Sequence, residues 1–173
     1  MSRTRWVRLA GLATIPLVTS AAIAGAPRLG EAVPGDVLAT IDYTVLPDGN
    51  GLPPGSGSAE TGASVYRAHC ASCHGADGTG GLNDRIVGGL GSLGTAAPIK
   101  TVGSYWPYAT TLFDYIRRAM PYQAPGTLSD DQLYAVTAYV LSLDGIVGPR
   151  ATLDARSLPK VEMPNRNGFV RAD

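Results

Sequence analysis

The stretch Cys70-Ala71-Ser72-Cys73-His74 decides the fold of this chain. Its C-x-x-C-H spacing is the pattern that attaches a haem covalently. Two thiols three residues apart on a helical turn project to the same side, so each can form a thioether with one vinyl group of a porphyrin. The adjacent imidazole reaches the iron from the proximal face. The motif therefore predicts one covalent haem c, held by Cys70, Cys73 and His74.

The cysteine pair fits disulfide, redox and zinc chemistry less well. The chain has only two cysteines, so neither has another partner. A short disulfide is one alternative, and a thioredoxin-like pair is another, but the latter follows a strand in a βαβ pattern that does not surround Cys70. A structural zinc site needs four ligands, and the chain has only two histidines. Haem attachment remains the prediction.

The N-terminus predicts a secretory signal peptide over residues 1–26. A basic start is followed by an apolar run from Leu9 to Ala24, and small residues up to Ala26 fit a cleavage site. A retained membrane anchor is the alternative, but the run contains Pro16 and is shorter than the ~20 residues that span a bilayer. Export predicts a periplasmic location, with no stable membrane span after cleavage.

The charge balance excludes two classes of partner. The chain has 14 basic and 14 acidic residues, and removal of residues 1–26 takes away three arginines and no acid. The mature chain is then mildly acidic. It has no basic footprint for nucleic acid and no polybasic segment for a membrane surface. We therefore expect neither as a partner.

Three helices are predicted from apolar residues at helical spacing, over about residues 61–71, 111–119 and 129–143. The third has the clearest start, because Ser129 with Gln132 three residues on forms a capping box. The first overlaps the start of the haem motif and the other two follow it, so together they predict a mainly helical domain that packs around one haem.

The helices divide the chain into four parts. Residues 1–26 are the signal peptide, residues 27–58 an extended N-terminal arm, residues 59–145 the haem-binding domain and residues 146–173 a C-terminal tail. The arm holds one predicted strand, residues 40–46. The tail has no periodic pattern, and three fates are open for it: docking on a partner, wrapping its own domain or disorder.

The sixth position of the iron has few candidate ligands. Met120 lies between the second and third predicted helices, so its loop can return over the far face of the haem. Met163 is the substitute candidate, and the alternative role for Met120 is to fill a gap in the core. His69 neighbours Cys70 and would have to reach around the ring. Ligation by His74 and Met120 raises the reduction potential.

At these residues the chain resembles a class I cytochrome c. That family crosses its N-terminal and C-terminal helices through a glycine and aromatics, and Gly62, Tyr66 and Tyr139 match those places. The resemblance implies an all-α fold of three main helices around one haem over residues 59–145, with extended arms at both ends. In the family a proline carbonyl orients the proximal histidine. The corresponding stretch here, residues 81–86, has no proline, so the orienting carbonyl is open.

The same resemblance suggests roles for residues around the second helix. Tyr105 and Trp106 lie where hydrogen-bond donors to haem propionates are expected, and plain core packing is the alternative. Arg117 and Arg118 lie just before Met120. They steer an acidic partner, or they form a solvated helix end where positive charge suits the helix dipole.

A narrower resemblance rests on residues 46–55 and 101–121. These stretches resemble the cytochrome subunit of the Sox sulfur dehydrogenase and related cytochrome subunits of sulfite dehydrogenases. The resemblance implies a molybdenum-cofactor partner subunit that oxidises a sulfur centre and passes electrons to the haem, with a cytochrome or oxidase downstream. It predicts an electron-transfer protein that leaves the sulfur chemistry to its partner.

Two further functions stay open at this stage. One is a free-standing electron shuttle to a terminal oxidase, against which the long arms argue mildly. The other is a haem enzyme such as a peroxidase. A peroxidase requires an open iron position, and Met120 argues against that.

Overall fold

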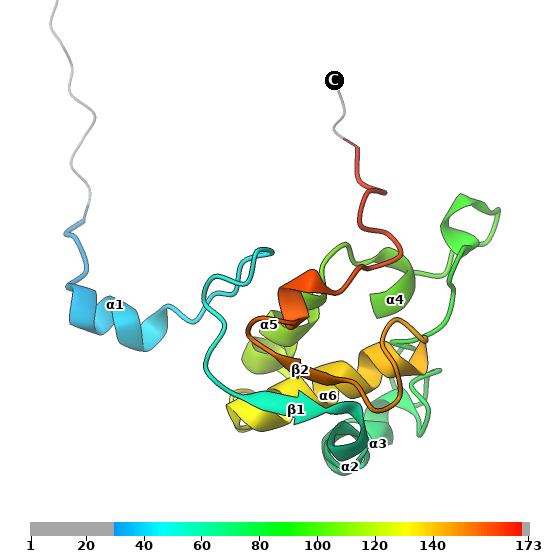
Figure 1. Ribbon diagram of the computed structural model, residues 1–173, viewed down its shortest axis with the longest axis horizontal. Helices are drawn as coiled ribbons and strands as arrows, with labels where there is room; N and C mark the ends of the chain where they lie inside the picture. The colour runs from blue at the N-terminus through cyan, green and yellow to red at the C-terminus, as the bar shows by residue number, and fades with distance from the viewer. Residues whose placement is uncertain (1–29, 171–173) are drawn as a thin grey trace, which may run out of the picture. The chain divides into compact units, whose positions relative to one another are not determined.

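The computed structural model describes residues 30–170 (Figure 1). The predicted signal peptide lies outside the described residues. The residues from Gly35 onward belong to one unit of the fold. Its elements follow along the chain as α1 (Gly35–Ile41), β1 (Ser56–Ser58), α2 (Ala59–His69), α3 (Ala71–His74), the 3-10 turn η1 (Ser92–Gly94), α4 (Val102–Tyr105), α5 (Ala109–Ala119), α6 (Asp130–Leu143), β2 (Thr152–Asp154) and the 3-10 turn η2 (Leu158–Lys160).

The three predicted main helices are confirmed as α2, α5 and α6, and their starts follow from their caps. The capping box at the start of α6 is formed: the N–H of Gln132 donates to Oγ of Ser129 at 3.3 Å, and the N–H of Ser129 donates to Oε1 of Gln132 at 2.9 Å. Helix α2 begins two residues earlier than predicted, because Ser58 caps it by accepting from the N–H of Thr61 at 3.1 Å.

Helices α2 and α6 form the expected crossing. A Cβ at Gly62 would overlap the carbonyl oxygen of Ala135 and lie 2.8 Å from the Cβ of Tyr139. The rings of Tyr66 and Tyr139 pack with centroids 5.2 Å apart. Glycine is therefore needed at position 62 because the two backbones approach too closely for any side chain.

The strand predicted over residues 40–46 is wrong. Residues 35–41 form α1, and the N–H groups of Thr44 and Leu46 bond within the arm, to Oδ1 of Asp42 and to the carbonyl of Asn50. The N–H of Val45 between them donates to Oδ1 of Asp114 on α5 at 3.0 Å. The β propensity of residues 40–46 is outweighed here by a contact with a helix that lies 69 residues away in sequence.

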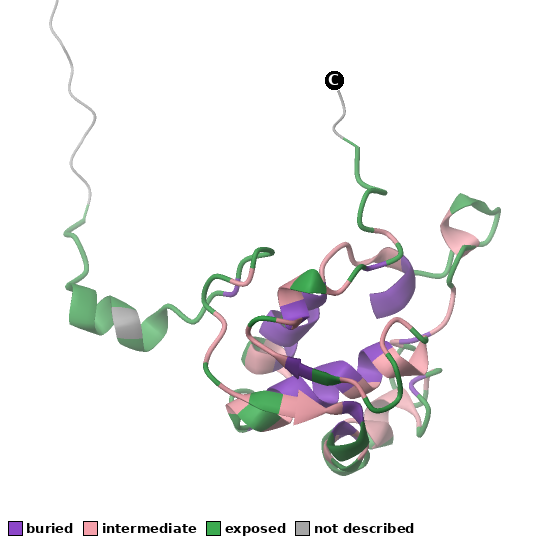
Figure 2. Cartoon of the chain, in the orientation of Figure 1, coloured by how far each residue is buried: buried purple, intermediate pink, exposed green. Residues whose placement is uncertain are grey.

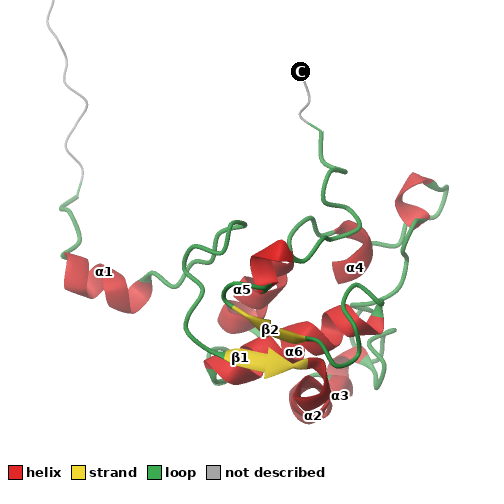
Figure 3. Ribbon diagram, viewed as in Figure 1, coloured by secondary structure: helices red, strands yellow, loops and turns green. Residues whose placement is uncertain are grey.

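The strands that do form join the two ends of the domain. β1 and β2 pair antiparallel, with Gly57 opposite Leu153, and the pair packs on α6 (Figure 3). A Cβ at Gly57 would come within 2.6 Å of the Cβ of Ala135, which shows how closely β1 lies on the helix. This small ribbon was not predicted, since each strand is only three residues long.

The C-terminal tail wraps its own domain over residues 153–165. Leu153, Leu158 and Met163 are buried in the core, and Figure 2 shows buried residues gathered on α5, α6 and β2. The amide of Asn165 donates to the carbonyl of Tyr105 at 2.6 Å. Of the three fates considered for the tail, residues 153–165 show packing on the chain's own domain, whereas the residues from 166 to 170 are exposed.

The described residues show the expected mainly helical architecture with three main helices, and the β1–β2 ribbon is an addition to it. No helix within residues 30–170 is both long and apolar enough to cross a membrane.

Candidate functional site

The cysteine pair lies where α2 passes into the short helix α3. The N–H of Cys70 donates to the carbonyl of Tyr66 at 2.8 Å, and the N–H of His74 donates to the carbonyl of Cys70 at 3.0 Å. Both cysteines are free and partly buried. Burial, with a smaller contribution from Cys73, raises the pKa of the Cys70 thiol to about 11. The helical turn therefore holds two thiols and an imidazole close together, and burial keeps the Cys70 thiol protonated.

A cavity of about 550 Å³ adjoins this turn. Its volume falls within the range of roughly 300–1,000 Å³ typical of ligand and cofactor sites. Much of its wall is apolar and comes from α4, α5, α6 and the loops that precede α4 and α6: Ile86, Val102, Leu112, Ile116, Leu128, Val136 and Val140. Five of the six predicted site residues also line it: Cys70, Cys73, His74, Trp106 and Met120.

His74 is oriented by a backbone carbonyl. Its Nδ1 lies 2.9 Å from the carbonyl oxygen of Asp84. A carbonyl can only accept, so Nδ1 carries the proton and Nε2 keeps its lone pair for a metal ion. This contact identifies the orienting carbonyl that sequence reasoning left open. Any residue type supplies a carbonyl, so no side-chain pattern marked Asp84 in advance.

The loop after α3 folds back over the motif. The N–H of Asn83 donates to the carbonyl of Cys73 at 2.8 Å, and the N–H of Gly80 donates to the carbonyl of His74 at 3.0 Å. Gly75 turns the chain at φ +83°, a conformation that favours glycine. The hydroxyl of Tyr66 donates to the carbonyl of Gly75 at 2.9 Å. These bonds hold the Asp84 segment against the motif.

The far end of the same loop is fixed by α4 and the end of α6. The N–H of Gly88 donates to Oδ1 of Asp144 at 2.7 Å. The hydroxyl of Thr101 donates to the carbonyl of Gly88, also at 2.7 Å. Gly103 makes room for this arrangement, because a Cβ there would overlap the Asp144 carboxylate. The loop is therefore anchored at both ends, with Asp84 between the anchors.

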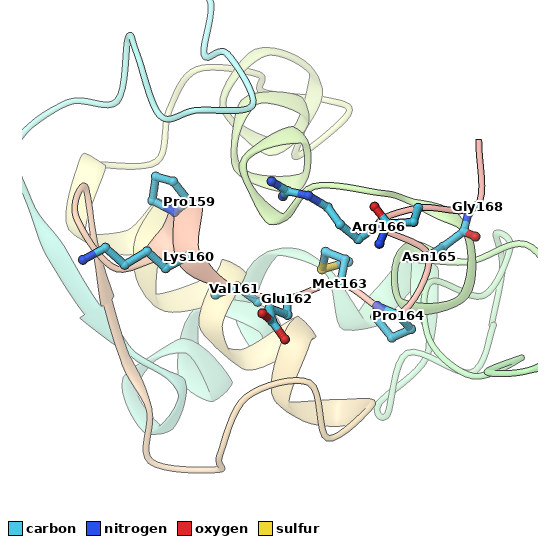
Figure 4. Close-up of a pocket in the computed structure, with 10 residues that line it drawn as sticks. Pro159, Lys160, Val161, Glu162, Met163, Pro164, Asn165, Arg166 and Gly168 are labelled. Atoms are coloured by element: carbon cyan, nitrogen blue, oxygen red, sulfur yellow. The ribbon is translucent and has the colours of Figure 1, made fainter. Parts of the chain in front are cut away.

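The structure favours Met120 over Met163 as the thioether that faces the cavity. Met120 caps α5, its N–H donates to the carbonyl of Ile116 at 3.0 Å, and it lines the cavity. Met163 is buried and lines a different cavity of about 500 Å³ within residues 159–168 (Figure 4). The two cavities share no lining residue. His69 also lines the first cavity, although its side chain is largely exposed.

The two aromatic candidates separate in space. The ring of Trp106 lines the cavity and packs edge-on against Tyr115, with centroids 5.6 Å apart. Tyr105 is not among the lining residues. Its ring packs against Phe169 at 5.2 Å, and the ammonium of Lys100 lies 5.1 Å from its centroid. The C-terminal tail therefore draws the Tyr105 ring away from the position expected for a haem contact.

The two arginines before Met120 hold the N-terminal arm and α5. Arg117 donates to the carbonyl of Tyr43 at 3.3 Å, and its guanidinium lies 5.6 Å from the centroid of that ring. Arg118 pairs with Asp114. Both positive charges thus have partners within the chain, which neither of the two roles considered for them anticipated.

The residues around the first cavity fit a haem c. Two adjacent thiols suit thioether bonds, the free Nε2 of His74 suits the iron, and the soft sulfur of Met120 suits the opposite position. The apolar wall suits the porphyrin faces. Sequence reasoning named the cysteines, His74 and Met120 that line this cavity, but it did not assign positioning roles to Tyr66, Asp84 and Asp144.

The helix crossing and the cavity together define the class of protein: a c-type cytochrome. A family model described as cytochrome c oxidase, cbb3-type, subunit III, matches residues 57–140. The crystal structure of the sulfane dehydrogenase SoxCD from Paracoccus pantotrophus matches with a TM-score of 0.79 and 41% identity, over 84% of this chain and 72% of that one. The chain therefore belongs to the Sox-type cytochrome subunits.

A curated relative gives a weaker match of the same kind. The thiosulfate dehydrogenase of Allochromatium vinosum is 29% identical over 120 residues, which is 66% of this chain. The matched region is 38% of the length of that protein. The similarity thus concerns only part of a longer relative.

Proposed function

We propose that this chain is a periplasmic monohaem cytochrome that relays single electrons as the redox subunit of a molybdenum-dependent sulfur-compound or sulfite dehydrogenase. The observation that carries this proposal is the cavity in which Cys70, Cys73, His74 and Met120 meet. The similarity to the sulfane dehydrogenase SoxCD over 72% of the solved chain supports the assignment to a sulfur-oxidising complex.

The chain's own residues account for the binding and orientation that this role needs. Cys70 and Cys73 would hold the cofactor covalently, and the Asp84 carbonyl fixes the imidazole plane of His74. A bound haem would supply reversible one-electron exchange at its iron. Met120 would be the second protein ligand of the iron, so the site would exchange electrons and would not bind a substrate. The apolar wall of the cavity would limit the contact between the cofactor and water. Such surroundings of low polarity are typical of a haem with a high reduction potential.

The partner carries out the sulfur chemistry in this proposal. A molybdenum centre in that partner would take two electrons from the substrate, and this chain would pass them on one at a time to a downstream cytochrome or oxidase. The chain is therefore not the catalytic subunit.

Two experiments test the two halves of this function. In the first, the full-length chain is produced with haem-attachment machinery, fractionated and digested. We expect it in the periplasm, with the mass of one haem on the peptide that contains residues 70–74. Loss of that mass in Cys70→Ala with Cys73→Ala is the control. An unmodified peptide in the wild type would refute the cytochrome role.

The second experiment purifies the protein from its native host and measures molybdenum in the complex. We expect a co-purifying subunit with stoichiometric molybdenum that reduces the haem when a sulfur substrate is added. A monomer that carries haem but binds no such subunit would instead support the free-standing shuttle.

A further inference from the structure

The N-terminal arm exposes an unusual amount of apolar surface. Of the thirteen exposed large hydrophobic side chains among the described residues, five lie within a stretch of ten: Val37, Leu38, Ile41, Tyr43 and Leu46. On α1, Val37, Leu38 and Ile41 are 46%, 45% and 58% exposed. Their spacing places them on one face of the helix. We refer to these three residues as the arm face.

The helix that carries the arm face needs burial to be stable. α1 has seven residues, and isolated helices shorter than about 12 residues are marginal in water. Its local support is small: Asp36 lies in the first turn, and the hydroxyl of Thr40 donates to the carbonyl of Val37 at 2.7 Å. An exposed apolar cluster on a helix of this length indicates a surface that another molecule covers.

The root of the arm is fixed to the domain. Val45 is buried, and its N–H donates to Asp114 at 3.0 Å. Arg117 donates to the carbonyl of Tyr43, and the hydroxyl of Thr110 donates to the carbonyl of Pro47 at 3.4 Å. The arm therefore leaves the domain from α5, the helix that ends beside Met120.

The root also adjoins the first cavity, which is proposed to hold the haem and is called the haem cavity below. A groove of about 430 Å³ runs beside it, lined by Tyr43, Arg117 and Arg118 among others. Leu128 lines both this groove and the haem cavity. The groove beside the arm root and the haem cavity therefore adjoin at Leu128, which places a partner bound at the root near the haem cavity.

The charge of the arm selects the partner. The sequence has no lysine or arginine between Arg28 and Arg67, whereas Asp36, Asp42 and Asp48 lie in that interval. The surface of a partner that complements this acidic and apolar arm is an apolar groove with a basic rim. An anionic lipid surface would repel these acids. A second copy of the chain is a poor match at this site, because Arg117 and Arg118 are already bound to the arm and to Asp114.

We propose that the arm face docks into an apolar groove with a basic rim on the electron-donating dehydrogenase subunit, and so holds that subunit beside the haem cavity. The inference rests on the proposed function, since it names the surface through which that partner binds. Electrostatic attraction to the acidic arm speeds the encounter, and burial of the arm face slows dissociation.

The test measures binding of the haem-loaded chain to the purified molybdenum subunit by calorimetry or interferometry. The test variant combines Val37→Ser, Leu38→Ser and Ile41→Ser. The matched control is Leu90→Ser, which changes a side chain that is 47% exposed in the loop before η1. We expect the triple variant to lose at least about tenfold in affinity, while its haem spectrum and melting temperature stay those of the wild type. The control should bind like the wild type.

A charge variant tests the basic rim separately. Asp36→Lys should slow association, and the wild-type affinity should fall as salt is raised while that of Asp36→Lys falls less. If the triple variant binds as tightly as the wild type, the docking surface is wrong and the proposed function stands. If the wild type binds no molybdenum subunit, both are wrong. Binding of the arm to anionic vesicles, or a wild-type dimer that the triple variant abolishes, would overturn the choice of partner.

Discussion

The Nδ1 of His74 lies 2.9 Å from the carbonyl oxygen of Asp84, ten residues further along the chain. This contact sets the tautomer and the plane of the imidazole, and a hydrogen bond to Nδ1 makes Nε2 a stronger donor to the iron. The position of Asp84 depends in turn on the anchors of its loop, of which the Gly88–Asp144 contact is one. The haem potential should therefore respond to a residue that does not line the haem cavity.

Asp144→Ala should shift the reduction potential upward. It removes the acceptor for the Gly88 N–H, so the loop loosens and the Asp84 carbonyl binds Nδ1 less firmly. The free energy of unfolding should fall by about 1 to 3 kcal/mol. Potentiometry and denaturant unfolding measure the two effects. Asp144→Asn keeps an oxygen acceptor and should restore most of the wild-type potential. A lower stability with an unchanged potential in Asp144→Ala would limit Asp144 to a structural role.

Met120→Ala and Met163→Ala should differ in their effects on the haem spectrum and on stability. Met120→Ala should abolish the weak far-red absorption band of methionine-ligated ferric haem and allow rapid carbon monoxide binding by the ferrous protein, because it opens the sixth position. Met163→Ala should keep the band and lower the stability by about 2 to 5 kcal/mol, because it leaves a hole in the core. Optical spectra and thermal unfolding separate the two. Survival of the band in Met120→Ala would exclude Met120 as the ligand.

Gly62→Ala should destabilise the fold. The new Cβ overlaps the carbonyl of Ala135, so α2 and α6 must move apart, at a cost of about 1 to 3 kcal/mol. Gly148→Ala is the matched control, because nothing lies within 4 Å of a Cβ at that position. Chemical unfolding of the two variants gives the comparison. Equal stability of Gly62→Ala and the wild type would mean that the helices do not approach this closely.

The stability should fall in strong alkali through Tyr134. Burial, with help from Asp130 and Asp154, raises the pKa of this phenol from 10.0 to about 12, and its hydroxyl donates to the carbonyl of Pro53 at 2.8 Å. The folded state therefore prefers the protonated phenol. Its contribution to stability is fully present below pH 10 and is lost as the pH rises towards 12.

Unfolding free energies measured between pH 9 and pH 12 test this dependence on the phenol. Tyr134→Phe should be less stable than the wild type at neutral pH, because Pro53 loses its donor, and its stability should fall less steeply above pH 10. The remaining slope should come from Tyr66, whose pKa burial also raises to about 12. Identical slopes for wild type and variant would show that Tyr134 is not linked to folding.

The sequence was sufficient wherever the physical cause is local. Covalent attachment of a haem needs two thiols and an imidazole within five residues, so Cys70, Cys73 and His74 could be predicted as its site without reference to the rest of the fold. Helix periodicity and the Ser129–Gln132 capping box act within one or two turns, and these helices formed as predicted. The Gly62 crossing was predicted through the resemblance to class I cytochromes c, a family that crosses two helices at a glycine and aromatics.

Only the tertiary structure determined the features that depend on contacts between segments far apart in the sequence. The strand expected at residues 40–46 gave way to contacts with α5, and the β1–β2 ribbon required ends of the domain almost 100 residues apart to meet. The Tyr105 ring packs against Phe169 of the C-terminal tail and does not line the cavity. The Asp84 carbonyl became the partner of His74 because a backbone oxygen looks the same in every residue, and only the path of the loop brings one of them to the imidazole.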